Sequence, residues 1–399
     1  MTVAYLASEY PASSHTFIRR EIAALRVAGV KIAPFTIRAA PVGDGPLDLA
    51  ARAETSEVLG RSAMAYLLSV LAAAASGPLR WLATLRLALH HRVPGARALV
   101  WALFHFVEAL MLARLLRRVA ARHLHVHFAN SGATVGMLAA HYLRLPWSMT
   151  LHGISETDYP AGPLLADKIA RARFTACASW FMRAQAMRHA DPEHWDKLHI
   201  VRCGIDLKEL PQSHEKVDTR VRFVCVGRLS PEKGQRILLV ALRGLLDEGV
   251  DAQLELIGGG PEQAKLKALT GTLNLNEVVR FSGPLSESET LARIACGDVL
   301  VLPSFMEGLP LVLIEAMALG IPVIASAVAG IPELVEHRVN GLLVRASDTQ
   351  ELQRAMADLA RDPSLRRALG AVGRASVADE FALPGAALPL LTLLGELEA

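Results

Sequence analysis

Short apolar runs alternate with longer segments of helical periodicity along almost the whole chain. Runs of about four to eight apolar residues that are bounded by turn residues predict strands. The first series of expected strands covers residues 3–7, 30–37, 124–128, 147–151, 174–178 and 198–202. The second series covers residues 222–227, 253–258, 278–283, 298–302, 322–325 and 341–344. Because strands that alternate with helices form parallel sheets covered on both faces, the pattern predicts an α/β fold with two Rossmann-like domains.

A polar stretch at residues 206–220, which contains Pro211 and lacks a clear apolar period, separates the two series. We therefore predict a first domain over residues 1–205 and a second over 206–380, with the closing segment 381–399 packing back on the first. A length of 399 residues agrees with two domains. Ligands of two-lobed α/β proteins bind at the carboxyl ends of the strands, so we expect the site in a cleft between the lobes.

Composition narrows the class of protein. Hydrophobic residues make up 52% of the chain and charged residues 20%, which is enough apolar material for two cores. The four cysteines stand singly, so we expect neither a disulfide framework nor a zinc site, and a reducing, cytoplasmic setting. The N-terminal sequence has no basic segment followed by a long apolar run, which favours a first strand over a signal peptide. We expect no nucleic-acid partner.

Charge is unevenly spread, although the formal net charge is only +3. Residues 1–200 hold 22 Lys and Arg against 13 Asp and Glu, whereas the remainder holds 20 against 26. Much of the excess lies at about residues 61–122, where nine arginines accompany Glu108 alone. The apolar runs there carry charges or are shorter than the roughly 20 residues of a spanning helix, so we expect no transmembrane helix. A basic, apolar helical insertion fits either an anionic membrane surface or packing on its own domain.

The sequence GRLSPEKG at residues 227–234 directly follows an expected strand. Pro231 suits the first position of a helix and Ser230 its N-cap, which places Lys233 in the first turn and Arg228 in the preceding loop. A helix N-terminus offers free N–H groups and partial positive charge, so two added cations suit a diphosphate. An ordinary surface turn is the alternative.

Two further motifs also follow expected strands. The three glycines of IGGGPE, residues 257–262, allow either close approach of the backbone to a ligand or a tight turn alone. HG at residues 152–153 is well placed to reach into the cleft, although a lone histidine is more often structural.

Three histidines alternate along one expected strand. His123, His125 and His127 therefore share one face, as metal ligands would. No carboxylate or cysteine completes such a site nearby in the sequence, so we expect no metal.

Glu307 and Glu315 stand in the otherwise apolar segment 304–322. Pro310 fits the first position of a helix, so Glu307 is expected in a loop at the helix mouth and Glu315 on the helix itself. Ionised carboxylates can accept two hydrogen bonds from a vicinal diol. A nucleotide sugar carries such diols on its hexose and its ribose, joined by a diphosphate. A pair of solvated surface glutamates is the alternative.

In order and spacing, HG, GRLSPEKG and EGLP followed by a second glutamate resemble the retaining glycosyltransferases of the GT-B fold, commonly called family 4. The stretches YPASSHTFIRREIAAL, DPEHWDKLHIVRCGID and GIPELVEHRVNGLLV are similar to the bacterial branch that builds exopolysaccharides, including the colanic-acid-type enzymes. The resemblance covers most of the chain and is weakest over residues 40–120. It implies two Rossmann-like domains facing across a cleft. It also implies transfer of a hexose from a UDP- or GDP-linked sugar to a growing, lipid-linked exopolysaccharide or cell-surface glycan.

The resemblance implies roles for individual positions. Arg228 and Lys233 would contact the donor diphosphate, and Glu307 would contact the transferred sugar. Glu315 would hold the ribose hydroxyls, and His152 would contact the sugar near its anomeric carbon. The implied catalytic residues are His152, Arg228, Lys233 and Glu307. The resemblance implies backbone contacts with the donor at Gly308, Leu309, Pro310 and Leu311, and the full set of residues that we expect to bind the donor is Gly153, Gly227, Gly258, Gly259, Gly308, Leu309, Pro310, Leu311 and Glu315. The candidate acceptor contacts are Glu9, Ser14, His15, Thr16 and Arg19.

The chain departs from the family pattern at two places. SEYPASSHT replaces the glycine-rich loop after the first strand, which leaves the acceptor contacts open. Cys203 stands where many relatives have asparagine. Neither departure is expected to touch the catalytic residues.

The chemistry follows from the implied parts. No Asp-x-Asp metal motif is apparent, so we expect no metal or other cofactor, and Arg228, Lys233 and a helix N-terminus would neutralise the leaving phosphate. Retention is inferred from the resemblance, with front-face attack and the leaving phosphate helping to deprotonate the acceptor. A nucleotide-sugar epimerase of the same architecture and a membrane-associated, non-catalytic sugar-nucleotide binder are the alternatives. We expect a cytoplasmic location, on the inner face of the cytoplasmic membrane if the insertion binds lipid.

Overall fold

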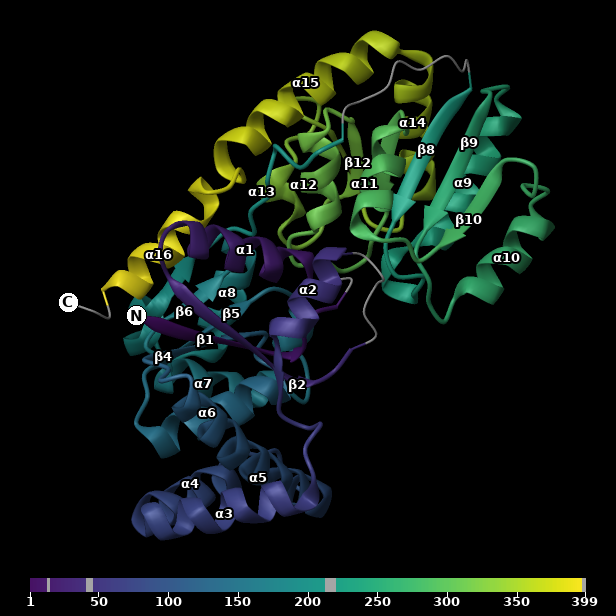
Figure 1. The fold of residues 1–399 in the computed structure, drawn as a ribbon. Coiled ribbons are helices and arrows are strands. Elements are labelled where there is room, and N and C mark those ends of the chain that lie inside the picture. The colour runs from purple at the N-terminus through teal and green to yellow at the C-terminus, as the bar shows by residue number, and fades with distance from the viewer. Residues whose placement is uncertain (13–14, 41–45, 212–219, 397–399) are drawn as a thin grey trace. The chain divides into compact units, whose positions relative to one another are not determined.

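The chain forms two compact units in the computed structural model, which describes residues 1–12, 15–40, 46–211 and 220–396 (Figure 1). Unit 1 comprises Met1–Cys203 with Ala387–Ala399, and unit 2 comprises Gly204–Ala386. The predicted boundary segment 206–220 therefore begins just inside unit 2, and its residues 212–219 lie outside the described part of the chain.

Unit 1 is built on one parallel sheet. Its strands are β1 (Thr2–Glu9), β2 (Lys31–Arg38), β3 (Ser56–Glu57), β4 (His123–His127), β5 (Trp147–Leu151), β6 (Thr175–Cys177) and β7 (Leu198–Ile200). Its α-helices are α1 (Thr16–Val27), α2 (Pro46–Glu54), α3 (Ala63–Ser76), α4 (Pro78–His90), α5 (Ala96–Arg118), α6 (Ser131–Leu143), α7 (Leu165–Arg171), α8 (Trp180–His189) and α16 (Leu388–Gly395). The strand order is β3-β2-β1-β4-β5-β6-β7. The order reverses between β1 and β4, so the switch point at which ligands of such sheets bind lies beyond the carboxyl ends of these two strands.

Unit 2 repeats this architecture with a second parallel sheet. Its strands are β8 (Val221–Val226), β9 (Ala252–Ile257), β10 (Val279–Gly283), β11 (Val299–Leu302), β12 (Val323–Ser326) and β13 (Leu342–Val344). Its α-helices are α9 (Gln235–Asp247), α10 (Gln263–Thr272), α11 (Glu287–Ala295), α12 (Leu311–Ala318), α13 (Ile331–Leu334), α14 (Thr349–Arg361) and α15 (Pro363–Glu380). The strand order β10-β9-β8-β11-β12-β13 reverses between β8 and β11. The switch point of unit 2 therefore lies between the loops that follow β8 and β11.

The predicted α/β class with two parallel sheets is confirmed. All twelve predicted strands are present, and their ends agree with the structure within two residues. The short strand β3 was not predicted, because two residues carry no periodicity; it pairs with β2 through Phe35 and Thr36. Both sheets are covered by apolar helix faces, and each sheet contributes fully buried side chains such as Leu124 and Phe223 to its core.

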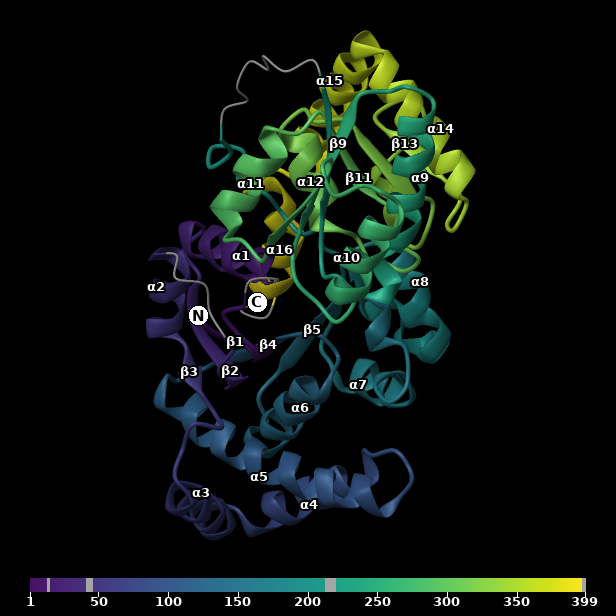
Figure 2. The same ribbon diagram turned by 90° about the vertical axis from the view of Figure 1, so that its right-hand side faces the viewer.

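The predicted insertion forms the three helices α3, α4 and α5, which lie together on one side of the unit 1 sheet beyond α6 (Figures 1 and 2). Among the described residues, α5 is the one helix long and apolar enough to cross a membrane by length and composition. We predicted that the apolar runs here carry charges or are too short to span a membrane; α5 is long enough, and it carries charged residues such as Glu108 and Arg114. Half of the most apolar part of α5 is nevertheless buried inside the unit.

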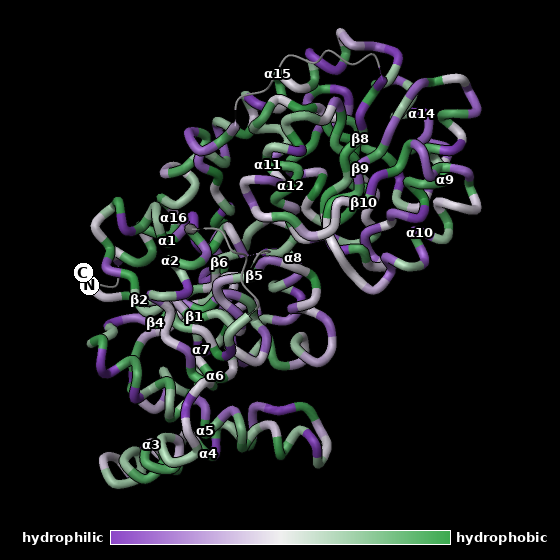
Figure 3. The backbone as a smooth tube through the Cα atoms, turned by 45° about the vertical axis from the view of Figure 1, so that its right-hand side comes forward, coloured by the Kyte–Doolittle hydropathy of each residue, from purple (hydrophilic) through white to green (hydrophobic). Residues whose placement is uncertain are grey.

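The helix α3 consists mostly of hydrophobic residues (Figure 3), and both α3 and α4 expose apolar side chains. Their exposed apolar side chains are Met64, Leu67, Leu68, Leu71, Leu79 and Leu82. A helix that only covers a core normally places polar residues on its outer side, so this face is unusual for a soluble surface.

Candidate functional site

The loops of GRLSPEKG and SFMEGLP flank the switch point of unit 2, because they follow β8 and β11 respectively. The backbone after β8 passes through Gly227 at φ 155° and then Arg228, whose side chain is exposed. Gln235 at the start of α9 donates from its side-chain amide to the Arg228 carbonyl oxygen at 3.0 Å. Arg228 is thus presented on a braced loop, as the sequence predicted.

Local geometry corrects two details of that prediction. Pro231–Lys233 form a single 3-10 turn, and α9 begins only at Gln235. Lys233 therefore ends the turn before the helix instead of lying in its first turn. The Ser230 side chain makes no capping hydrogen bond; its hydroxyl donates to the Glu232 carboxylate at 2.6 Å. Gly234 separates the turn from α9 at φ 66°, and a Cβ there would lie 2.0 Å from the Pro303 carbonyl oxygen, so only glycine fits.

Lys233 and Glu307 form an ion pair across the two loops. The Lys233 ammonium donates to the Glu307 carboxylate at 2.6 Å. The Glu307 side chain is only 7% exposed, whereas that of Lys233 is 23% exposed. Burial of the carboxylate is offset by this partner. The sequence assigned the two residues to different parts of a ligand, and the structure shows that they contact each other.

The IGGGPE glycines serve backbone packing between neighbouring loops. A Cβ on Gly258 would lie 2.1 Å from the Gly227 carbonyl oxygen, and one on Gly260 would lie 2.3 Å from that of Leu229. The Leu229 backbone N–H donates to the Gly259 carbonyl oxygen at 2.9 Å. Gly258 and Gly260 are therefore needed for the approach of one loop to the other, whereas a Cβ on Gly259 would meet nothing closer than 3.6 Å.

The two glutamates of SFMEGLPLVLIEAMALGIP occupy the two predicted environments. Glu307 precedes α12, and Glu315 lies within it and is also buried. Pro310 is the N-cap of α12 and not its first helical residue. The Leu313 N–H donates to the Pro310 carbonyl oxygen at 3.1 Å, so the first N–H groups of α12 that could meet a ligand belong to Leu311 and Val312, shortly after Glu307 and Gly308 in the chain.

The candidate acceptor residues lie around the switch-point loop of unit 1, at the end of β1, in the loop itself and at the start of α1. Glu9 ends β1 and pairs with Arg38 at 2.7 Å, and Arg19 pairs with Asp48 at 2.6 Å. The His15 ring is held by a hydrogen bond to the Glu9 carbonyl oxygen at 2.8 Å.

The helix that follows the same loop begins at Thr16. Burial lowers the pKa of the His15 imidazole. Ser14 lies outside the described residues.

His152 follows β5 and is fixed on several sides. Its ring contacts His127 through a 3.0 Å hydrogen bond, and it packs against Phe17 and Phe128. Burial lowers the pKa of His152 well below its usual value, with His127 and His15 adding to the effect. The imidazole is therefore neutral near pH 7, with one ring nitrogen a hydrogen-bond donor and the other an acceptor.

Glu156 is a site residue that the sequence interpretation missed. Its carboxylate accepts backbone N–H groups from His152 at 2.6 Å, Gly153 at 2.8 Å and Ala129 at 2.6 Å. It thereby holds the HG loop to the end of β4. Burial raises the pKa of Glu156 to about 7, against the lowering effect of these bonds and of Lys168. A glutamate three residues after a turn glycine is the spacing of a capping box, which was the available signal.

Cys203 and Glu21 correct two further expectations. The Cys203 thiol lies 3.8 Å from the Nδ1 atom of His152, so this departure from the family does touch a residue assigned to catalysis. Glu21 from α1 lies 3.4 Å from His127 and accepts the Tyr5 hydroxyl at 2.8 Å. The histidine face of β4 therefore has a carboxylate beside it, which no local sequence signal indicated.

Among the described residues, one group has side chains that could together hold a metal ion, and it consists of Glu21, His125 and His127. Both ring nitrogens of His125 are already hydrogen-bonded, to Ser148 at 2.7 Å and Thr150 at 2.8 Å. A metal would have to displace one of these hydroxyls. The cluster therefore forms a buried polar network, in which hydrogen bonds to neighbouring side chains orient the imidazole rings.

Comparison with known proteins finds a family to which part of unit 2 is similar. Residues 206–376 match the model of the glycosyl transferases group 1. AmsK of Erwinia amylovora, an amylovoran biosynthesis glycosyltransferase, is 31% identical over 193 residues, which are 47% of each chain. WcaL of Salmonella typhimurium, named for colanic acid biosynthesis, is 32% identical over 194 residues, 47% of this chain and 48% of its own. The chain thus spans about half the length of these relatives.

Solved structures extend the likeness to the whole fold. Sucrose-phosphate synthase from Thermosynechococcus elongatus superimposes with a TM-score of 0.77 at 22% identity and covers 100% of this chain and 99% of its own. Alr3699/HepE of Anabaena, solved with UDP-glucose, gives a TM-score of 0.75 at 17% identity over 99% of this chain and 100% of its own. At these identities the likeness concerns the fold alone.

Proposed function

We propose that this chain, which has the GT-B fold and a glycosyl transferases group 1 domain at residues 206–376, is a retaining hexosyltransferase of family 4. Its donor is a UDP- or GDP-linked sugar, and its acceptor is a growing, lipid-linked exopolysaccharide or cell-surface glycan. AmsK and WcaL, whose names place them in exopolysaccharide biosynthesis, support this choice of acceptor.

One observation carries the proposal: cationic and acidic side chains converge at the switch point of unit 2. Arg228 is exposed there, and Lys233 is paired with the buried Glu307. A diphosphate at this place would draw on Arg228, on Lys233 and on the N–H groups at the start of α12. Release of Lys233 toward the diphosphate would free the Glu307 carboxylate to accept hydrogen bonds from the sugar hydroxyls.

The leaving group is the nucleoside diphosphate, and negative charge develops on its outer phosphate as the bond to the sugar breaks. Donors already in place stabilise such charge more than mobile water does. We propose that Arg228 and Lys233 provide this stabilisation and that no metal takes part. Glu315 would hold the ribose, and the neutral His152 of unit 1 would contact the sugar, as the family resemblance implies.

The test is release of UDP or GDP from a panel of nucleotide sugars, with and without a lipid-linked saccharide. We expect Arg228→Ala and Lys233→Ala to lower the rate about 10²- to 10³-fold. Arg361→Ala is the control, because this exposed arginine of unit 2 pairs only with Glu248 at 2.7 Å in the described structure. Near-normal transfer by either site variant would overturn the assignment.

The products separate the alternatives. Conversion of the donor to a sugar of changed configuration, independent of any acceptor, would indicate an epimerase. Nucleotide binding without turnover of any donor would indicate a non-catalytic binder.

We also propose that unit 1 attaches to the cytoplasmic face of a membrane through α3 and α4. The exposed leucines of these helices, with Leu79 at 81% exposure, would enter the boundary between headgroups and acyl chains, and the arginines of the insertion would meet anionic lipids. Sedimentation with anionic and neutral vesicles tests this. The double variant Leu67→Glu/Leu71→Glu should lose vesicle binding, whereas Val27→Glu, at a residue of α1 that is 87% exposed, should keep it. Equal binding by both variants would refute attachment through α3.

A further inference from the structure

A pocket of about 550 Å³ lies at the carboxyl edge of the unit 1 sheet, in a place to which none of the sequence motifs points. One wall is the first half of α5, and the other consists of segments that follow β2, β4 and β5. Its lining residues are Arg38, His91, Arg92, Val93, Ala98, Trp101, Ala102, His105, Asn130, Ser131, Thr134, Ser155, Pro160, Ala161, Leu164 and Lys168. His127 is the last residue of β4, and Asn130 follows soon after it. The pocket therefore opens at the edge of the sheet that carries the His127–His152 pair.

The inner end of the pocket holds the buried amine of Lys168. Burial lowers the pKa of this amine to about 7, against the raising effect of Glu156 and Asp167, and a bound anion would favour its charged form. Lys168 is 1% exposed, and its ammonium donates to the carbonyl oxygens of Ala129 at 2.6 Å and Asn130 at 3.1 Å. When protonated, the amine has three N–H donors, so one remains for a ligand beyond these two hydrogen bonds. The helix α6 begins at Ser131, which lines the same wall, and the N-terminal end of this helix adds partial positive charge.

Arginines complete this charge at the side of the pocket. Arg92 is held by a hydrogen bond from its Nε atom to the Leu89 carbonyl oxygen at 2.9 Å. Arg38 pairs with Glu9 at 2.7 Å and lies at the rim. No aspartate or glutamate is among the lining residues, although the Asp167 carboxylate lies behind the wall, 2.6 Å from the Nδ1 atom of His91.

The outer part of the pocket is apolar. Ala98, Trp101 and Ala102 face it from α5, and Pro160, Ala161 and Leu164 face it from the segment after β5. Trp101 is half-exposed, and its neighbours Val100 and Phe104 are exposed as well. An apolar path therefore runs from the outer surface of the helical insertion to the buried ammonium. Pockets of this size with apolar walls and a few convergent polar groups are the usual form of small-molecule sites.

We propose that this pocket binds the phosphate- or diphosphate-bearing end of an anionic amphiphile, whose apolar chain lies along α5. The proposal deepens the proposed function and rests on it, because a lipid-linked saccharide acceptor has this chemistry. A bilayer phospholipid has it too, and the experiment separates these two sources.

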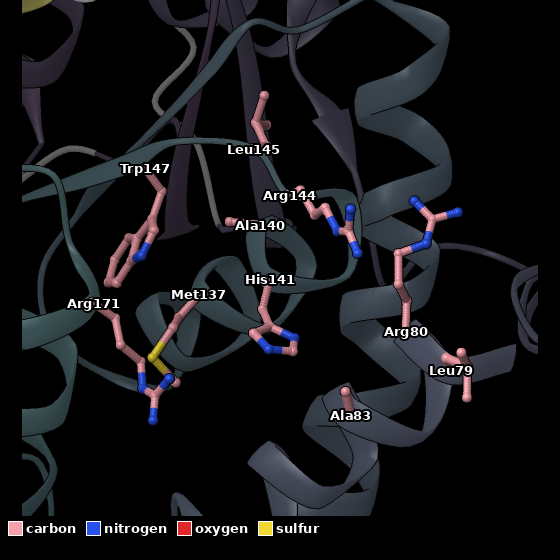
Figure 4. A pocket seen from close by; sticks show the side chains of 10 residues that line it. All are labelled: Leu79, Arg80, Ala83, Met137, Ala140, His141, Arg144, Leu145, Trp147 and Arg171. Carbon is pink, nitrogen blue, oxygen red and sulfur yellow. The ribbon is translucent and has the colours of Figure 1, made fainter. Parts of the chain in front are cut away.

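A second basic pocket provides the internal control. It measures about 480 Å³ and is lined by Leu79, Arg80, Ala83, Met137, Ala140, His141, Arg144, Leu145, Trp147 and Arg171. Figure 4 shows Arg80 and Arg144 on one side of His141 and Arg171 on the other. Trp147 begins β5 and Arg144 follows the last residue of α6, so this pocket lies at the amino edge of the sheet, away from His152. This second pocket offers similar positive charge, but at the amino edge of the sheet, where an acceptor would not reach the expected site.

The probe is farnesyl diphosphate, with inorganic diphosphate and farnesol as its two halves, titrated calorimetrically into the full chain. We expect the whole probe to bind more tightly than either half. Arg92→Glu should weaken binding at least tenfold by reversing one wall charge, and Ala98→Trp should weaken it by filling the apolar part. Arg144→Glu in the second pocket and Arg97→Glu, an exposed residue of α5 outside the lining, should remain within twofold of the wild type.

The outcomes are distinct. Equal weakening by Arg92→Glu, Arg144→Glu and Arg97→Glu, or absence of binding by the wild type, would overturn the proposal. If Arg92→Glu weakens farnesyl diphosphate but not anionic phospholipid vesicles, the site takes a lipid-linked acceptor; if it weakens both equally, the site takes a membrane phospholipid. Release of UDP or GDP from the donor alone should be unchanged in Arg97→Glu, which lies outside the lining. If the wild type binds farnesyl diphosphate but turns over no donor, the proposed function is contradicted and the pocket assignment stands.

Discussion

Lys233 and Glu307 offer a sharp test of the site, because they contact each other as well as the expected ligand. If each residue acted on the donor independently, the effects of Lys233→Met and Glu307→Gln on donor turnover would multiply. The 2.6 Å ion pair instead makes each residue a partner that positions the other. We therefore expect the double variant to lose much less activity than the product of the two single losses.

The size of this coupling follows from distance and burial. Close charge pairs across a protein–protein interface couple by about 1.5–7 kcal/mol in double-mutant cycles, which serves as the reference range here. The Glu307 side chain is 7% exposed, but that of Lys233 is 23% exposed, so solvent screens part of the attraction. We therefore expect a coupling free energy of about 2 kcal/mol between Lys233 and Glu307, at the low end of that range, which corresponds to roughly thirtyfold in kcat/KM. Each single change should cost about 10²- to 10³-fold, and the double change roughly thirtyfold less than their product.

The assay is kcat/KM for release of the nucleoside diphosphate from the best donor of the panel, measured for the wild type, both single variants and the double variant. Circular dichroism and thermal unfolding verify that each variant is folded. The control cycle uses the exposed pair Arg361 and Glu248, for which we expect no measurable coupling. If the loss in kcat/KM of the double variant is within twofold of the product of the two single losses, the reasoning is refuted, since Lys233 and Glu307 would then act separately on the donor.

Three further predictions concern the scaffold and its thiols. Gly258→Ala should destabilise unit 2 by more than about 2 kcal/mol, because its Cβ would lie 2.1 Å from a carbonyl oxygen at a φ of +130°, whereas Gly259→Ala should be tolerated; equal thermal midpoints by circular dichroism would contradict this. Glu156→Ala should destabilise unit 1 by about 3 kcal/mol or more, because it leaves three backbone N–H groups without their acceptor. Tryptophan fluorescence in urea isolates that unit, since all five tryptophans belong to it, and a loss below about 1 kcal/mol would argue against the three bonds. Iodoacetamide at pH 8 should label only the exposed Cys296 in the folded chain and all four thiols in denaturant. Labelling of the three buried thiols should increase only as the pH approaches 12. A second labelled thiol in the folded chain at pH 8 would contradict this prediction. Burial raises the pKa of each of these three thiols to about 12, which keeps them protonated: Cys177, Cys203 and Cys225.

Local periodicity was sufficient to predict the strands of both sheets, because a strand of five apolar residues with turn residues on each side is encoded within its own segment. The same local information placed Arg228 and Glu307 in loops after strands and Glu315 on a helix. Once the strand series were known, the switch points followed, since the carboxyl ends of neighbouring parallel strands meet at one edge. The expected location of the donor chemistry in unit 2 is therefore a property of the sequence pattern.

Contacts between distant segments were beyond that pattern. The IGGGPE glycines approach the neighbouring loop at Gly227 and Leu229, a contact that local sequence cannot distinguish from approach to a ligand. Glu21 reaches His127 across more than a hundred residues, and Lys233 reaches Glu307 across 74.

The pocket beside Lys168 likewise exists only because α5 packs beside the carboxyl edge of the sheet. The sequence by itself thus determined the secondary structure, the sheets and the chemical types available at the switch points. Only the tertiary structure decided which of those groups touch, because burial and partner choice depend on residues brought together by packing and not on their spacing along the chain.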